Sequence, residues 1–339
     1  MSEHPAAPGA GTERPPAALV VFRLAALFTF LAVVMGSVVC ATKSGASCPT
    51  WPGCRNEAIT PQWRLSPWIE FTHRVVAMAS GPLVLAAGIL AGRLPRADRW
   101  LRVLPWVAVA CAIASGAFGR LVVVATLPTW LGGVDLTCAL VAMTLTAVAA
   151  VRAGARSREA DQDADRAGAR ARAADRPYRV TSATAAASLV TVIAMHVSGI
   201  FAAGSGSYTR CLGWPLWRLV DADPHPVLQA TRLGLAGLAS ALVVVTAVRA
   251  ARTTRLRRWG VALAGLWVLE MVLGTALSAN GLDDATATGY SVTACALLWT
   301  LGLLSAVAGH AAPAPLDPPA PHDPEETVID VRGALAGRD

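Results

Sequence analysis

One short stretch, W68-I-E-F-T-H-R-V-V-A77, brings together three residue types that do chemistry: Glu70, His73 and Arg74. A carboxylate can relay protons, an imidazole can bind a metal ion, and a guanidinium can hold a carboxylate. On a helix that starts near Pro67, His73 lies roughly 9 Å along the axis, and Glu70 shares its face. Ionisable groups so deep in an apolar run usually face a bundle interior, a partner or a ligand.

Each of these residues also has an ordinary structural interpretation. His73 could be a neutral imidazole bonded to a neighbouring helix, and Glu70 could form an i,i+4 pair with Arg74. Arg74 could extend to the lipid headgroups or bind a ligand carboxylate. From the residues alone, these alternatives stay open.

The composition indicates an integral membrane protein. The 339 residues are 54% hydrophobic and 15% charged, with a mean hydropathy of +0.49, and the apolar residues gather into long runs. The formal charge is +7, but the arginines fall between the apolar runs and no aromatic-basic pattern accompanies them. We therefore expect contact with membrane lipid and no nucleic-acid partner.

Eight runs are long enough to cross the hydrocarbon core, which takes about 20 residues. They are residues 18–41, 68–92, 101–126, 128–151, 180–203, 226–248, 259–279 and 287–309. The connections after the second, fourth and sixth runs are rich in arginine, so the positive-inside rule places them in the cytoplasm. Residues 152–179 are then a charged cytoplasmic linker. We expect a multi-pass protein of the cell membrane with both termini cytoplasmic, and disorder in residues 1–17 and 310–339.

The two halves of the chain resemble each other. The first outer loop, S44-G-A-S-C-P-T-W-P-G-C54, is echoed by G206-S-Y-T-R-C-L-G-W-P-L-W217 in the third. The aligned pairs are Cys48 with Cys211, Trp51 with Trp214, and Cys54 with Trp217.

A membrane helix follows each loop, with E70-F-T-H-R74 in the first half and L228-Q-A-T-R232 in the second. The sequence therefore predicts an all-α membrane protein built from two tandem four-helix repeats, residues 18–151 and 180–309. An even number of helices gives both repeats the same orientation.

Together, these features resemble the haem A synthase family of respiratory oxidase assembly. The resemblance covers nearly the whole membrane region and rests on the loop pattern S-G-x-x-C-P-x-W-P-x-C and the E-x-x-H-R motif. Members of that family convert haem O to haem A by oxidising a porphyrin methyl group to a formyl. The resemblance implies haem O as the substrate, and haem O synthase or oxidase assembly factors as partners.

The resemblance also implies roles for the motif residues. Glu70 would be the acid beside the reacting haem, and His73 an axial ligand of the iron. Arg74 and its second-repeat counterpart, Arg232, would contact haem. We expect any haem chemistry to be concentrated in the first repeat, because Glu70 and His73 lie there.

The family has further histidines in its fourth, sixth and eighth helices, and this chain has other residues there: Asp135, Thr231 and Tyr290. Asp135 could be an oxygen ligand, a hydrogen-bond partner of water on the iron, or a polar contact near the membrane surface. Tyr290 could bind iron or anchor at the interface. His225 could reach a haem near the outer surface, and His196 is a weaker candidate. A bis-histidine haem B site is not expected in the second repeat.

The cysteines divide by their place in the sequence. The C-x5-C spacing of Cys48 and Cys54 in an outer loop favours a disulfide, which the resemblance also implies, and a zinc site lacks further ligands nearby. Cys40 could compete for either partner, and Cys211 has lost its mate to Trp217.

Aromatic residues mark the outer boundary of the membrane. Tryptophans gather there, and we expect them to be interface anchors. They are Trp51, Trp63, Trp68, Trp214 and Trp217.

Three functions are consistent with this sequence, and we favour a haem A synthase-type oxidoreductase. A non-catalytic haem-binding or oxidase-assembly protein would explain the missing second-repeat histidines. A transporter or structural bundle that shares the fold alone is disfavoured by the retained E-x-x-H-R motif and the paired loop cysteines.

Overall fold

The structure is a computed structural model that describes most of the chain in eight segments. They are residues 17–55, 59–94, 98–124, 128–162, 171–202, 210–215, 226–281 and 283–311. Within these segments the secondary structure is helical and contains no strand. Eight of the helices are long and apolar enough to cross a membrane, which confirms the predicted all-α membrane fold.

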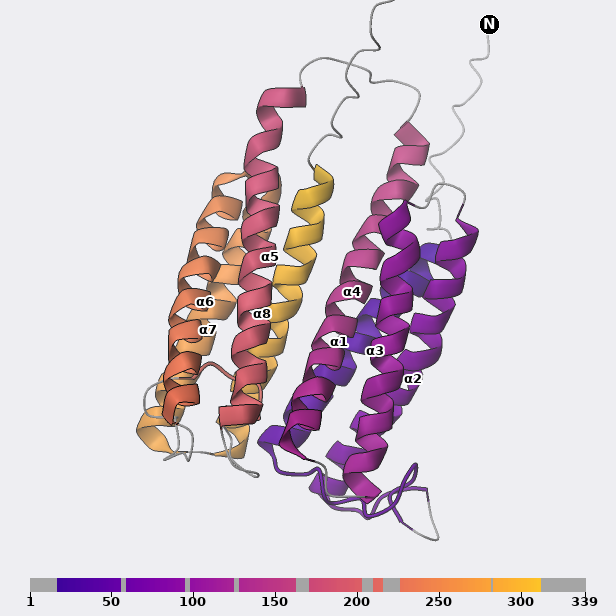
Figure 1. Ribbon diagram of the computed structural model, residues 1–339, viewed down its shortest axis with the longest axis vertical. Coiled ribbons are helices and arrows are strands. Elements are labelled where there is room, and N and C mark those ends of the chain that lie inside the picture. Colours follow the sequence, from indigo (N-terminus) through magenta and orange to yellow (C-terminus); the bar gives the residue numbers. More distant parts are fainter. Residues whose placement is uncertain are drawn as a thin grey trace, which may run out of the picture.

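The membrane helices follow one another along the chain as eight rods (Figure 1). They are α1 (Ala17–Ala41), α2 (Leu65–Arg93), α3 (Arg99–Val124), α4 (Thr129–Gln162), α5 (Ala171–Ala202), α6 (Pro226–Arg252), α7 (Arg257–Asn280) and α8 (Asp284–Ala311). A single 3-10 turn, η3 (Thr254–Leu256), joins α6 to α7. Helices α4 and α5 run further into the arginine-rich connection than their predicted spans, because alanine and arginine are strong helix formers in water.

The helices form two four-helix bundles that lie side by side (Figure 1). In the first bundle α1 contacts α2 and α4, and α3 contacts α2 and α4; α5 to α8 repeat this ring in the second bundle. Helix α8 packs against both α1 and α4, and α5 packs against α4. This arrangement is consistent with the predicted pair of repeats.

The described loop residues 42–55, 59–64 and 210–215 lie at one end of the bundles, which we call the loop end (Figure 1). Helix α1 begins and α8 finishes at the opposite end (Figure 1). Helices α2, α4 and α6 also end there, at Arg93, Gln162 and Arg252 (Figure 1).

The buried apolar core is distributed unevenly between the bundles. One cluster fills the first bundle away from the loop end and includes Phe22, Val84 and Leu101. The other runs through the second bundle and along its contact with α1 and α4. Neither cluster contains a residue of the loop-end halves of α2 and α3, residues 65–79 and 112–121. The loop-end halves of α2 and α3 therefore contribute nothing to the two buried apolar clusters of the described residues.

Candidate functional site

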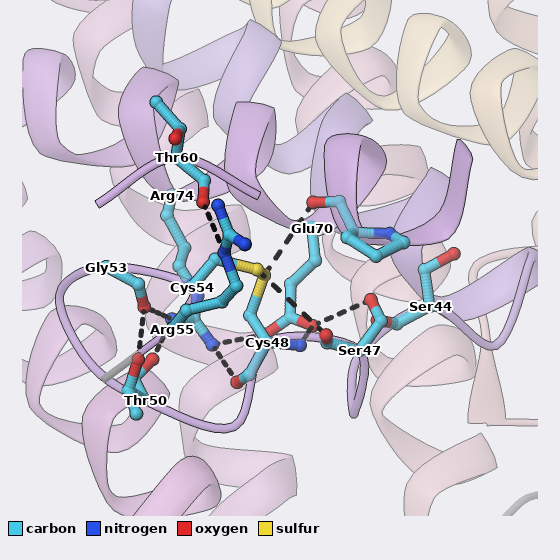
Figure 2. The surroundings of a disulfide bond; sticks show 11 residues. Ser44, Ser47, Cys48, Thr50, Gly53, Cys54, Arg55, Thr60, Glu70 and Arg74 are labelled. Carbon is cyan, nitrogen blue, oxygen red and sulfur yellow. Dashed lines mark hydrogen bonds and ion pairs between the residues drawn. A yellow bond between two sulfur atoms is a disulfide. The ribbon is translucent and has the colours of Figure 1, made fainter. Parts of the chain in front are cut away.

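Glu70 binds the first loop. Its carboxylate accepts a hydrogen bond from the backbone N–H of Cys48 at 2.8 Å and one from the hydroxyl of Ser47 at 3.1 Å. It also forms an ion pair with Arg74 one turn along α2, so the i,i+4 alternative is present in the structure. Figure 2 shows how these side chains surround the loop. Glu70 is buried, at 4% exposed.

Arg74 completes this clamp from the same face of α2. Its guanidinium donates to the backbone carbonyls of Cys48 at 3.0 Å and Gly53 at 2.9 Å, and also to that of Thr50 (Figure 2). A buried ion pair is stable when hydrogen bonds satisfy its remaining donors and acceptors, and these carbonyls do so. Arg74 therefore points into the loop and does not extend to the membrane surface.

The clamped loop contains the predicted disulfide. Cys48 and Cys54 are joined, with their Cα atoms 4.3 Å apart, which confirms this pairing. Both residues are 1% exposed. An external thiol must reach a sulfur atom to exchange with it. Because both cysteines are buried, the disulfide is a structural crosslink in this conformation.

His73 lies one turn below Glu70 and packs against α1 at Gly36. A Cβ at Gly36 would lie 3.2 Å from the His73 Cε1 atom. The absence of a side chain at Gly36 therefore makes space for the imidazole. The Nδ1 atom is buried and has no hydrogen-bond partner among the described residues. A buried ring nitrogen without a partner is costly, and a ligand such as haem iron would satisfy a nitrogen of this ring.

Asp135 makes a polar contact inside the first bundle. Its carboxylate accepts a hydrogen bond from the Ser115 hydroxyl, which links α4 to α3. This is a polar contact of the kind considered for Asp135, and the proposed ligand roles of this residue stay predictions. No group of three His, Cys, Asp or Glu residues in the described segments could hold a metal ion. His73 is the candidate iron ligand of the first bundle, and in the second bundle the Nε2 atom of His196 is likewise buried without a hydrogen-bond partner among the described residues.

A surface cleft of about 510 Å³ opens at the loop end, away from these residues. Its lining residues are Arg55, Thr60, Pro61, Gln62, Trp63 and Trp68. Trp63 is 91% exposed, as expected of an interface anchor. The cleft contains neither Glu70 nor His73, so the candidate chemistry is not located there.

The second bundle differs from the first at the matching positions. Arg232 is buried and donates to the Gly213 carbonyl at 3.3 Å, which parallels the bond from Arg74 to the aligned residue Thr50. Thr231 is exposed and bonds its own helix at Val227, so it does not face the bundle interior. His225 lies outside the described residues.

Two aromatic residues expected at the membrane interface are buried in the core. Tyr290 is 0% exposed and its hydroxyl donates to the Trp214 carbonyl. Trp214 is 2% exposed. The interface interpretation is wrong for both residues, because the loop segment that carries Trp214 turns into the second bundle.

The expectation that Cys211 lacks a partner is also wrong. Cys211 forms a disulfide with Cys40 at the end of α1, across a sequence separation of 171 residues. Alignment of the repeats suggested partners within each loop. It could not show that packing of the bundles brings the end of α1 to the second loop.

Sequence reasoning missed one buried acid altogether. Glu270 on α7 is 0% exposed and accepts a hydrogen bond from the backbone N–H of Trp214 at 3.1 Å. It is the single carboxylate in the apolar run 259–279. A lone acid in a membrane span is itself a signal of a buried role, so the sequence contained the information.

Comparison with known proteins bears on this arrangement. A family of cytochrome oxidase assembly proteins matches residues 20–301 of the chain. A protein named heme A synthase from Shewanella oneidensis is 24% identical over 331 residues, which cover 83% of this chain and 93% of the relative. The heme A synthase of Symbiobacterium thermophilum is 28% identical over 254 residues, 72% of this chain and 80% of the relative.

Proposed function

Since the chain belongs to the family of cytochrome oxidase assembly proteins that includes the haem A synthases, we propose that it oxidises the methyl group of haem O to a formyl group. The coarser role, in haem A biosynthesis or cytochrome oxidase assembly, follows from the family itself. The reaction would take place in the loop-end half of the first bundle.

The observation that carries this proposal is the packing around His73. Its imidazole has a buried nitrogen without a partner, and the surrounding loop-end halves of α2 and α3 contribute no residue to either apolar core. A porphyrin is a large apolar ligand whose iron takes an imidazole ligand. The buried ring nitrogen of His73 is the feature of the first bundle that supports haem binding there.

Individual residues have distinct parts in the proposed site. His73 would hold the haem iron, through which electrons removed from the methyl group would pass to an external oxidant. Glu70 and Arg74 fix the loop over that end of the bundle through the bonds described above. The family resemblance gives Glu70 a further part in proton transfer near the reacting methyl group.

A non-catalytic haem-binding or assembly protein is the second candidate. Both Glu70 carboxylate oxygens are already engaged, by Arg74 and by the loop, which favours a structural part for this acid. Asp135 is bonded to Ser115, and Thr231 faces out of the bundle. These contacts are consistent with a haem-binding protein that has lost turnover.

We also propose that the loop end faces the outside of the cell membrane and that both termini are cytoplasmic. Both disulfides lie at the loop end, and disulfides persist on the oxidising side of a membrane. Arg93 in the last turn of α2 and Arg249 and Arg252 in the last turn of α6 lie at the opposite end, where the positive-inside rule expects the cytoplasm.

The test is the haem content of the purified protein with separate replacements at the two motif residues. We expect wild-type protein, expressed with haem O supplied, to yield haem A or hydroxylated haem O on chromatography. H73A should lose haem, and E70Q should retain haem but lose product. Haem that is bound without product in wild-type protein would support the second candidate, and wild-type protein with no haem would contradict both.

A further inference from the structure

The second loop enters its bundle, whereas the first loop does not. All five residues of the segment 211–215 are buried. Trp214 is 2% exposed, but Trp51, its partner in the alignment of the repeats, is 43% exposed and lies against Arg120 at 5.6 Å. The two loops have similar sequences, so the difference in their positions comes from the contacts that each bundle makes with its loop.

Every helix of the second bundle directs one polar or aromatic side chain to this segment. Arg232 of α6 donates to Gly213, Glu270 of α7 accepts from Trp214, and Tyr290 of α8 donates to Trp214. The His196 ring of α5 meets the Trp214 indole edge-on, with centroids 6.4 Å apart. The indole N–H of Trp214 also donates to the Ala236 carbonyl at 3.3 Å.

These contacts satisfy the polar atoms that Trp214 takes into the core. The backbone N–H and carbonyl of Trp214 and its indole N–H are all bonded. Burial of a loop normally leaves backbone groups without partners, which is unfavourable in an apolar bundle. The second bundle supplies the partners through Glu270 and Tyr290, whereas the aligned loop of the first bundle is hydrogen-bonded to α2, through Glu70 and Arg74.

The segment is also fastened covalently to the other bundle. Cys211, three residues before Trp214, is joined to Cys40 at the end of α1. Helix α1 carries Gly36, which contacts His73. The disulfide therefore connects the buried loop of one bundle to the helix that lines the proposed haem site of the other.

We propose that the segment Cys211–Trp214 is a built-in plug that takes the place of a haem in the loop-end half of the second bundle. Trp214 and Tyr290 fill the bundle interior, and the Tyr290 hydroxyl is engaged by the plug. The second bundle is closed to porphyrin. This inference rests on the proposed function and deepens it, because it confines the substrate haem to the first bundle.

A free cysteine of the chain reports on the plug. Cys295 of α8 is unpaired, 0% exposed, and belongs to the same core cluster as Trp214 and Tyr290. With Cys111 and Cys138 replaced by alanine, the remaining four cysteines are in disulfides. The rate at which a small methanethiosulfonate reagent labels Cys295 then measures opening of the second bundle.

The labelling rate of Cys295 is measured on full-length protein in detergent, in four variants that all also lack Cys111 and Cys138. We expect Trp214→Ala to raise the labelling rate at least tenfold and the matched Trp51→Ala to leave it unchanged. Replacing Cys40 and Cys211 by serine should also raise the rate, whereas replacing Cys48 and Cys54 should not. If Trp214→Ala does not fold, the comparison of the two cysteine-to-serine double variants tests the plug by itself. Equal rates in each test variant and its control would overturn the plug.

Titration with iron protoporphyrin IX separates this proposal from the proposed function. We expect no more than one haem per chain in wild-type protein and none in H73A. A haem bound to H73A that protects Cys295 from the reagent would place porphyrin in the second bundle and overturn the plug. Wild-type protein that binds no haem but keeps Cys295 protected would contradict the proposed function and support the plug.

Discussion

Gly36 and His73 meet where α1 crosses α2, and their contact leads to a prediction about the iron ligand. Gly36→Ala would place a Cβ 3.2 Å from the imidazole, so the ring must shift. Overpacking of this kind costs about 1–3 kcal/mol, and we expect haem affinity to fall roughly tenfold. Titration with haem, followed by absorbance, measures the change.

Gly81→Ala is the matched control for this substitution. Gly81 lies two turns from His73 on α2, and a Cβ there meets nothing within 4 Å. Its haem affinity should equal that of wild-type protein. Equal affinities for all three proteins would show that His73 does not hold the iron.

The Glu70–Arg74 pair gives a second prediction at the scale of residues. Glu70→Ala removes the acceptor for Cys48 N–H and leaves Arg74 buried without its counterion. Breaking a buried pair in this way costs about 3–5 kcal/mol. Glu70→Gln retains an acceptor oxygen and should be less destabilised.

Thermal unfolding in detergent measures the difference between these two variants. A structural clamp requires the order wild type, E70Q, E70A in decreasing stability. If both variants are as stable as wild-type protein, the carboxylate is not needed for the fold, and its pairing with the loop would serve another purpose such as proton transfer.

The sequence predicted the residues of the first site better than those of the second. Glu70, His73 and Arg74 lie on one helical turn, so their proximity follows from helix geometry alone. Glu270 and Trp214 are 56 positions apart in the chain, and no periodic pattern brings them together. The hydrogen bond between them depends on the path of a loop, which local sequence does not specify.

Among the elements, the eight helices were predictable because a membrane span needs a long apolar run. The loops were not. Aligned sequences at Trp51 and Trp214 adopt different positions, one at the surface and one in a core. The difference comes from the helices around them, since buried Glu270 and Tyr290 bond the second loop and α2 clamps the first.

The clamp on the first loop predicts how its disulfide responds to reductant. Arg74 holds three loop carbonyls, and both sulfurs are buried, so reduction requires the loop to open. We expect Arg74→Ala to accelerate reduction of Cys48–Cys54 by about tenfold or more. A tenfold change in rate corresponds to about 1.4 kcal/mol, which is less than the free energy of the hydrogen bonds that this variant loses. Alkylation of released thiols, followed by mass spectrometry, measures the rate.

Arg120→Ala is a control from the same end of the molecule. Arg120 lies over the Trp51 ring and is exposed, and it is not bonded to the loop backbone in the contacts described. Its loss should leave the reduction rate unchanged. An unchanged rate in Arg74→Ala as well would mean that the guanidinium does not restrain the loop.

At the scale of the whole molecule, the two bundles are joined by packing and by one covalent link. Helices α4 and α8 pack together, α8 also contacts α1, and Cys40 is bonded to Cys211. In the chain-entropy description, a disulfide that closes a loop of this length contributes about 5 kcal/mol, against about 2 kcal/mol for a short loop such as Cys48–Cys54. We therefore expect Cys40–Cys211 to be the larger contributor to stability.

Cutting the chain between the bundles tests the link directly. A protease recognition sequence inserted between residues 162 and 171 lies between the two cysteines, which are 171 residues apart. After cleavage, the halves should run as one species on a denaturing gel without reductant and as two with it. The Cys40→Ser, Cys211→Ser variant should separate in both conditions, and the Cys48→Ser, Cys54→Ser variant should behave as wild type. Because denaturant removes helix packing but not a disulfide, separation of the wild-type halves without reductant would mean that the bundles are held by packing alone.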